Sequence, residues 1–176
     1  MSLMSDEYRA LMIKTHEMYP QWGNGGKRHY NPLVDLIRAN KFETVLDFGC
    51  GVGLIGNTLL AQKVLKPEQL QMYDPGMPQY SAPPRPADLV ICTDVLEHVE
   101  PEHLDGTLTF LRFLAGKMAY FNIGVTPAAK ILPDGRNAHL IVQPPVWWEE
   151  KLSQHWSSVN RTLQRDGLVN PTYVCE

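Results

Sequence analysis

An acid followed by three alternate glycines gives the stretch VLDFGCGVG (residues 45–53) the composition of a ligand-binding turn. The acid is Asp47, and the glycines are Gly49, Gly51 and Gly53. Because glycine lacks a Cβ, the backbone can bend sharply there and approach a ligand closely. The helix expected just after the turn directs its free N–H groups and its dipole at that ligand, which favours an anionic group.

Asp47 helps to distinguish between two nucleotide-like ligands. GVGLIG (residues 51–56), with Asp74 downstream, also matches a dinucleotide-binding pattern. A pyrophosphate gains nothing from a second negative charge close by. S-adenosylmethionine carries an ammonium and a sulfonium as well as a carboxylate, so an acid beside an N–H-rich turn complements both signs. Asp74 can accept the ribose hydroxyls of either ligand and does not discriminate between them.

Further polar side chains follow the apolar run ADLVICT. Asp94, Glu97 and His98 come at its end, and His139 follows the next predicted strand. Transfer of a sulfonium methyl group needs a positioned nucleophile and, where the nucleophile carries a proton, a base. We therefore predict Asp94, His98 and His139 as catalytic residues, with His98 or His139 as the general base. An orienting role within its loop is the alternative for His139.

The elements that must position these residues alternate between helix and strand. Helical spacing and capping signals predict helices over residues 5–19, 31–40, 54–64, 101–116 and 144–156. Short apolar runs predict strands over residues 41–49, 69–74, 87–99 and 117–125, and a final hairpin turning at Asp166 and Gly167. This order predicts an α/β fold with a Rossmann-like, mostly parallel sheet, an antiparallel C-terminal edge hairpin and helices on both faces. Ligands bind such sheets outside the carboxyl ends of the strands.

Three motifs extend the pattern to a known family. VLDFGCGVG, MYDPG and DLVICTDVLEHV resemble the first, second and fourth motifs of class I S-adenosylmethionine-dependent methyltransferases, over residues 30–176. DVLEHV is especially similar to the ubiquinone-biosynthesis methyltransferase-like branch. The resemblance implies S-adenosyl-L-methionine as cofactor, with Asp47 at its amino group and Asp74 at its ribose. The implied cofactor-binding residues are Asp47, Gly49, Cys50, Gly51, Gly53, Asp74, Pro75, Asp94, Val95 and Leu96.

The sequence departs from that family after Asp74. The family has a helix and another strand there, whereas PGMPQYSAPPRP (residues 75–86) is too short and too rich in proline for both. We therefore expect a shortened crossover after the second strand. Met77 or Tyr80 could cover the adenine ring, or the loop is merely packed.

A metal-dependent alternative comes from a second resemblance. Asp94, Glu97, His98 and His139 loosely resemble the Glu/Glu/His/His set of small-RNA 2′-O-methyltransferases, which implies a divalent cation and a terminal ribose. Many relatives with LEHV use this histidine only structurally, and the second histidine of the paired arrangement is missing. The prediction is therefore no metal, with this four-residue set as the alternative.

Composition limits the remaining possibilities. The 176 residues fit a single domain (residues 1–176), in which residues 1–30 form an N-terminal helix and a possible lid loop containing Lys27, Arg28 and His29. A net charge of −3 gives no electrostatic case for nucleic acid as the main partner, which favours a small-molecule acceptor and leaves nucleic acid open. Three scattered cysteines suggest neither disulfides nor a thiolate zinc site, and no export or membrane segment is evident, so we expect a cytoplasmic protein.

The sequence leaves two other functions open. One is a non-catalytic S-adenosylmethionine-binding subunit of another enzyme, and the other is an NAD-dependent oxidoreductase. The acceptor, its reacting atom and the oligomeric state are not defined by the sequence. We predict a methyltransferase.

Overall fold

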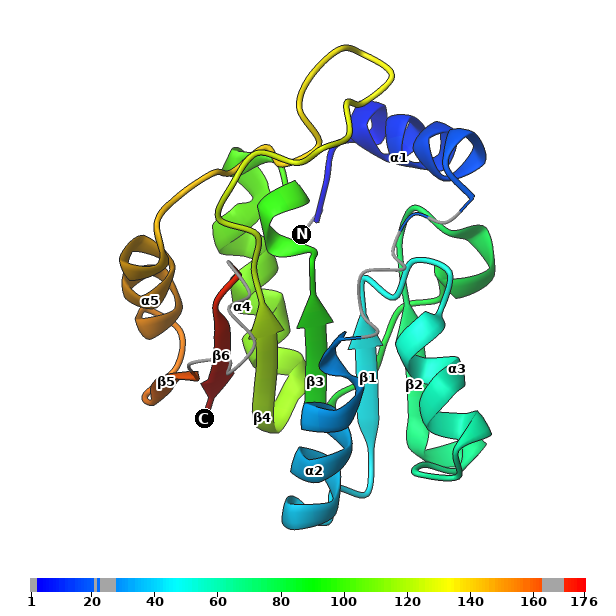
Figure 1. The fold of residues 1–176 in the computed structure, drawn as a ribbon, viewed down its shortest axis with the longest axis vertical. Coiled ribbons are helices and arrows are strands. Elements are labelled where there is room, and N and C mark those ends of the chain that lie inside the picture. Colours follow the sequence, from blue (N-terminus) through cyan, green and yellow to red (C-terminus); the bar gives the residue numbers. More distant parts are fainter. Residues whose placement is uncertain (1–2, 21, 23–27, 163–169) are drawn as a thin grey trace.

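The computed structural model describes residues 3–20, 22, 28–162 and 170–176, which build a six-stranded sheet of order β2-β1-β3-β4-β6-β5 (Figure 1). The strands are β1 (Val45–Phe48), β2 (Leu70–Tyr73), β3 (Ala87–Thr93), β4 (Ala115–Asn122), β5 (Val159–Thr162) and β6 (Thr172–Cys175). The first four pair in parallel, whereas β6 runs antiparallel to both β4 and β5. The predicted Rossmann-like sheet with an antiparallel C-terminal edge hairpin is confirmed, with β5 outermost. The turn predicted at Asp166 and Gly167 lies outside the described residues.

Helices cover both faces of the sheet, as predicted. The α-helices of the described residues are α1 (Asp6–Met18), α2 (Tyr30–Asn40), α3 (Leu54–Ala61), α4 (Leu104–Leu114) and α5 (Pro145–Ser153). Successive side chains of a strand point to opposite faces. Leu89 and Ile91 of β3 therefore pack in one core layer with α2 and α3, and Val90 and Cys92 pack in the other with α4 and α5.

The connection from β2 to β3 contains no α-helix and no further strand, which confirms the shortened crossover. Its only regular element is a 3₁₀ turn at Pro78–Tyr80. The segment then returns along the outer edge of β2, where the Gln71 side chain bonds both the amide of Arg85 (3.0 Å) and its carbonyl (3.2 Å). β2 is an edge strand because no further strand pairs beside it, and one glutamine side chain attaches the returning segment to it.

Helix α1 lies over the carboxyl ends of the strands rather than on either face of the sheet (Figure 1). Tyr8 and Met12 pack there in a small separate core with Leu132 of the long loop after β4. The amide and hydroxyl of Ser5 both donate to the Glu100 carboxylate, each at 2.7 Å, which fixes the start of the helix. Helix α1 and the loop packed against it therefore cover the end of the sheet where a ligand is expected.

The start of α2 differs from the prediction. The sequence suggested Asn31 as the N-cap and Pro32 as the first helical residue, but the helix begins at Tyr30 with His29 as its N-cap. Pro32 lies within the first turn, where its missing N–H costs nothing because amides there have no partner in the helix. The prediction was wrong because either position suits proline.

The structure bears on the predictions made for the cysteines and for membrane-spanning segments. Cys50, Cys92 and Cys175 are all buried free thiols. None of the described helices combines the length and the apolar character needed to cross a bilayer.

Candidate functional site

The glycines after β1 adopt backbone angles that other residues rarely take. φ is 72° at Gly49, 53° at Gly51 and 76° at Gly53. A Cβ on Gly49 would lie only 2.4 Å from Cγ2 of Val95. Glycine therefore lets the turn approach the residues that follow β3, and the predicted tight turn is confirmed.

Asp74, at the end of β2, closes the turn from the opposite side. One carboxylate oxygen accepts the Gly51 amide and the other accepts the Gly76 amide, both at 2.8 Å. Each oxygen keeps a second lone pair for a ligand hydroxyl. The two amide bonds thus hold the carboxylate in one orientation before any ligand arrives.

Asp47 is a buried acid without a cationic partner. Its side chain is only 3% exposed and accepts the Gly56 amide of α3 at 3.2 Å. Burial raises the pKa of Asp47 to about 7, and the nearby negative charge of Asp74 adds to this rise. Among the described residues no ion pair involves Asp47, so a cationic ligand would stabilise its charged form.

A cavity of about 110 Å³ joins these groups to the ends of β1 and β3. Most of the predicted site residues line it, and His98 lies in its wall. The lining residues predicted from the sequence are Asp47, Gly49, Cys50, Gly51, Asp74, Pro75, Asp94, Val95 and His98. The structure therefore brings together residues that are up to 51 positions apart, from Asp47 to His98.

The remaining predicted residues lie around the cavity without lining it. Gly53 is the N-cap of α3, and a Cβ there would meet the Tyr80 hydroxyl at 2.8 Å. The side chain of Leu96 is 1% exposed and packs in the core beneath the site. Met77 and Tyr80, the residues considered for the adenine ring, are also absent from the lining.

The opposite wall comes from α1, which the sequence analysis did not assign to the site, and from Trp22 of the predicted lid loop. Tyr8, Met12 and His16 recur every four residues along α1 and face the cavity, together with Trp22. The apolar side chain of Met18, which fits the same helical spacing, is 51% exposed and does not reach the cavity lining. The four-residue spacing of larger, partly polar side chains was the signal that could have identified this wall.

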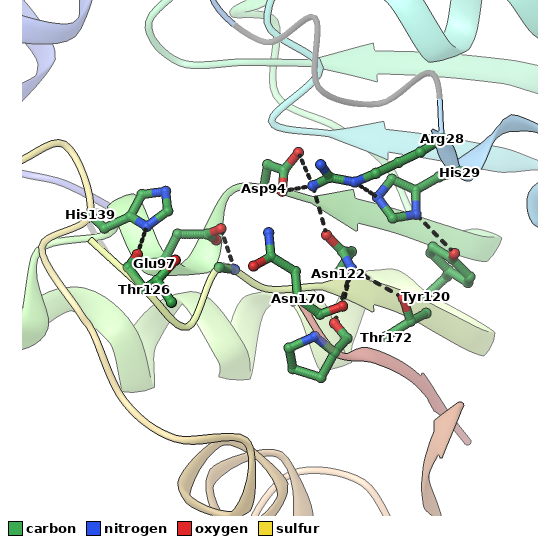
Figure 2. Close-up of polar contacts among 12 residues, drawn as sticks. Arg28, His29, Asp94, Glu97, Tyr120, Asn122, Thr126, His139, Asn170 and Thr172 are labelled. Atoms are coloured by element: carbon green, nitrogen blue, oxygen red, sulfur yellow. Dashed lines mark hydrogen bonds and ion pairs between the residues drawn. The ribbon is translucent and has the colours of Figure 1, made fainter. Parts of the chain in front are cut away.

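Asp94 is strained and paired. Its φ of 54° is left-handed, which is uncommon for a residue with a side chain. Nη2 of Arg28 lies 2.8 and 3.1 Å from the two carboxylate oxygens, and Nε of Arg28 donates to Nε2 of His29 at 3.0 Å (Figure 2). Burial raises the pKa of Asp94, and the Arg28 charge opposes that rise. Arg28 therefore holds Asp94 in place, while Lys27 of the predicted lid lies outside the described residues.

The two candidate bases after β3 and β4 have the same tautomer. Nδ1 of His98 bonds the Ala138 carbonyl at 2.7 Å, and Nδ1 of His139 bonds the Thr126 carbonyl at 2.5 Å. A carbonyl only accepts hydrogen bonds, so each Nδ1 carries the proton and each Nε2 has a free lone pair. Burial lowers the pKa of His98 to about 4, so its ring is neutral at neutral pH. The two ring centroids lie 4.8 Å apart.

Comparison with known proteins agrees with this architecture. A family model described as a methyltransferase domain matches residues 23–165. No curated protein sequence matches the chain. The methyltransferase domain of a bacterial Hen1 protein (CtHen1-CN) has a TM-score of 0.61 at 16% identity, covering 85% of this chain and 98% of that chain.

Two further solved structures cover almost the whole chain. The 1,6-didemethyltoxoflavin-N1-methyltransferase of Burkholderia thailandensis, with bound 1,6-didemethyltoxoflavin and S-adenosylhomocysteine, has a TM-score of 0.56 at 16% identity; 96% of this chain and 88% of that chain are covered. The DhpI–SAH complex has a TM-score of 0.55 at 15% identity, with 97% and 93% covered. At such identities the similarity establishes the fold.

Proposed function

The chain belongs to the methyltransferase domain family, and from this premise we propose that it transfers a methyl group from S-adenosylmethionine to a small organic acceptor. When bound, this cofactor supplies a methyl group that its sulfonium already activates. The observation that carries the proposal is one cavity with an acidic, amide-rich end and an apolar wall. The protein's own task is to bind, orient and shield the two reactants.

The residues at the acidic end fit the cofactor's charges and hydroxyl groups. Asp47 lacks a cationic partner among the described residues and would bind the ammonium group, which compensates its burial. The carboxylate of Asp74, already oriented by two amides, would accept the ribose hydroxyls. The amides of Gly49 and Cys50 donate to the Tyr73 carbonyl and the amide of Gly51 donates to Asp74, so the turn keeps its shape around the place for the cofactor.

Two polar atoms in the cavity wall support the same fit. His16 Nδ1 and Thr107 Oγ1 are buried and have no hydrogen-bond partner among the described residues, and both residues line the cavity. Buried polar atoms are nearly always paired in native proteins. A bound ligand with hydrogen-bonding groups would supply the partners that these two atoms lack.

The other wall supports a small acceptor. Leu3, Met4, Tyr8, Met12 and Trp22 form a largely apolar surface opposite the acids. Helix α1 lies over this end of the sheet (Figure 1), and a covered, largely apolar surface suits a compact organic molecule better than a polymer. The Burkholderia protein described above binds a small heterocycle, which is consistent with this class.

We propose His98 as the residue that faces the acceptor. Its ring lines the cavity, and its Nε2 carries a free lone pair for the acceptor's reacting group. Asp94 also lines the cavity, but its carboxylate is engaged by Arg28, so we assign it a positioning role. The DVLEHV motif alone supports the ubiquinone-biosynthesis-like branch, and the three free cysteines support a reducing cytoplasm.

Binding of S-adenosylhomocysteine tests the proposal without knowledge of the acceptor. At a concentration 100 times its Kd, this ligand is expected to stabilise the protein by about 2.7 kcal/mol in a thermal-unfolding assay, whereas NAD(H) is expected to have no effect. Asp74→Asn should weaken binding at least about 10-fold, because an amide replaces one of the oriented acceptors. Asp35→Asn, an exposed acid of α2, is the matched control and should bind normally.

Two results would decide between the functions that the sequence left open. A folded protein that responds to NAD(H) and ignores S-adenosylhomocysteine contradicts the proposal. If the cofactor binds, a panel of small hydroxylated and heterocyclic acceptors is expected to release S-adenosylhomocysteine in at least one case. A binding subunit without catalytic activity would release none with any acceptor or partner.

A further inference from the structure

Three side chains beside the cavity present ligand atoms to a common space. Glu97 and His98 come from the 3₁₀ turn at Leu96–His98, and His139 comes from the loop after β4. Each offers one ligand atom, and these atoms all lie within 4.8 Å of one another. We propose that Glu97, His98 and His139 bind a divalent transition-metal ion at the edge of the cavity.

The buried carboxylate of Glu97 provides the strongest observation. The residue is fully buried, and its Oε1 accepts the Gly124 amide, a bond marked by the dashed line at the Glu97 carboxylate in Figure 2. Its Oε2 is also buried and has no hydrogen-bond partner in the part of the chain that the structure describes. A carboxylate oxygen without a partner is costly inside a protein, and a bound cation would remove that cost.

The hydrogen bonds of both histidines leave them ready to bind a metal. The Ala138 and Thr126 carbonyls hold the protons on Nδ1 of His98 and His139, respectively. Nε2 of each ring then carries the lone pair that can bind a metal ion. Metal-binding histidines commonly donate their other N–H to a carbonyl or a carboxylate, which fixes both the tautomer and the ring orientation. The loop around His139 therefore already provides this support.

The backbone at Gly124 makes room for the cluster. A Cβ at this position would lie 2.5 Å from Cε1 of His139 and 2.6 Å from Oε1 of Glu97. The φ angle of Gly124 is not left-handed, so the backbone conformation does not itself require glycine. The absence of a side chain is explained by the approach of the two proposed ligands.

The ligand set differs from the four residues suggested by the sequence. Asp94 is not part of the group, because Arg28 contacts both of its carboxylate oxygens. Two imidazoles and one carboxylate remain, a set typical of Zn²⁺, Fe²⁺ and similar ions rather than of Mg²⁺ or Ca²⁺, which prefer oxygen ligands. Three protein ligands leave coordination positions open for water or a substrate oxygen.

His98 links this site to the cavity, since it lines the cavity wall. With the ion bound, Nε2 of His98 is a metal ligand and no longer contacts the acceptor, whose hydroxyl or carbonyl oxygen would instead complete the coordination from the cavity side. Only this use of the metal rests on the proposed methyl transfer. The metal site itself depends on its three ligands alone.

Titration of the chelator-treated protein with Co²⁺, followed by visible absorption, tests the proposal. We expect saturable binding of one ion per chain, with ligand-field bands that a large excess of Mg²⁺ does not remove. His139→Ala and Glu97→Gln should each weaken binding at least about 10-fold. Gly124→Ala should do the same without removing a ligand, whereas His155→Ala, a histidine outside the cluster, should bind as the wild type does.

Circular dichroism establishes that each variant is folded before its affinity is compared. The proposal is overturned if the wild type shows no saturable Co²⁺ spectrum, or if His139→Ala and Glu97→Gln both bind like the wild type. S-adenosylhomocysteine binding by the metal-free protein is measured in parallel. Cofactor binding without Co²⁺ binding refutes only the metal site, and Co²⁺ binding without cofactor binding refutes only the proposed function.

Discussion

At pH 8 the Asp47→Asn variant without ligand is expected to be more stable than the wild type, while its affinity for S-adenosylhomocysteine falls about 100-fold or more. Burial raises the pKa of Asp47 to about 7, so folding above that pH places an uncompensated negative charge in the interior. A rise of this size corresponds to roughly 2 to 4 kcal/mol of lost stability. Asparagine removes the charge and can still accept the Gly56 amide.

The sign of the pH dependence follows from the raised pKa. Between about pH 4, where an unfolded aspartate ionises, and about pH 7, the folded protein holds a proton that the unfolded chain has released. The contribution of Asp47 to stability is therefore complete below about pH 4 and is lost as the pH rises through about 7. Asp47→Asn should lack this loss, so its advantage over the wild type grows from pH 5 to pH 8.

The cofactor is expected to have the opposite preference. An ammonium group near Asp47 favours the ionised carboxylate, so binding below about pH 7 should release a proton from this residue. Truncating one partner of a buried charge pair costs about 2 to 5 kcal/mol, which is roughly 30-fold to several thousand-fold in affinity and includes the expected loss of about 100-fold or more.

Urea unfolding at pH 5 and pH 8 and calorimetry with S-adenosylhomocysteine measure the two effects separately. Asp35→Asn provides an exposed control with neither effect. Unchanged ligand affinity in Asp47→Asn would exclude the proposed role of this acid. Equal stability of variant and wild type at pH 8 would show that its charge is compensated within the protein.

The parts of the fold set by local sequence were predictable. The apolar runs of β1 and β3 and the glycines after β1 are contiguous in sequence, so their structure follows from short-range sterics. The prolines between β2 and β3 exclude an α-helix by removing amides, which accounts for the shortened crossover. Parallel pairing of β1 and β2 then brings Asp47 and Asp74 together at the carboxyl ends of these strands.

The parts set by distant contacts were not predictable in the same way. Arg28 meets Asp94 across 66 positions, and no local pattern indicated that this carboxylate would be paired. The four-residue metal set therefore included an acid whose oxygens are already engaged. Similarly, the bond from Ser5 to Glu100, 95 positions away, places α1 over the cavity. The helical spacing of residues in α1 did not indicate which part of the sheet this helix would cover.

Gly49→Ala is expected to destabilise the protein by roughly 2 to 5 kcal/mol and to abolish detectable binding of S-adenosylhomocysteine. A left-handed φ of 72° costs a residue with a side chain about 1 to 2 kcal/mol. The new Cβ would also lie 2.4 Å from Cγ2 of Val95, which forces the turn and the residues after β3 apart and adds about 1 to 3 kcal/mol. The Gly51 amide, which orients the Asp74 carboxylate, moves with that turn.

Three companion variants separate the strain of the backbone from the steric clash. Gly135 also has a positive φ, 89°, but a Cβ there meets nothing within 4 Å, so Gly135→Ala should show the backbone cost alone. Val95→Ala removes the clashing methyl groups, and the double variant Gly49→Ala/Val95→Ala should therefore be more stable than the sum of the single effects predicts, by about 1 to 2 kcal/mol. Urea unfolding measures this coupling. Strict additivity would show that Gly49 is required only for its backbone angle. The close approach of the turn to Val95 would then not explain this glycine.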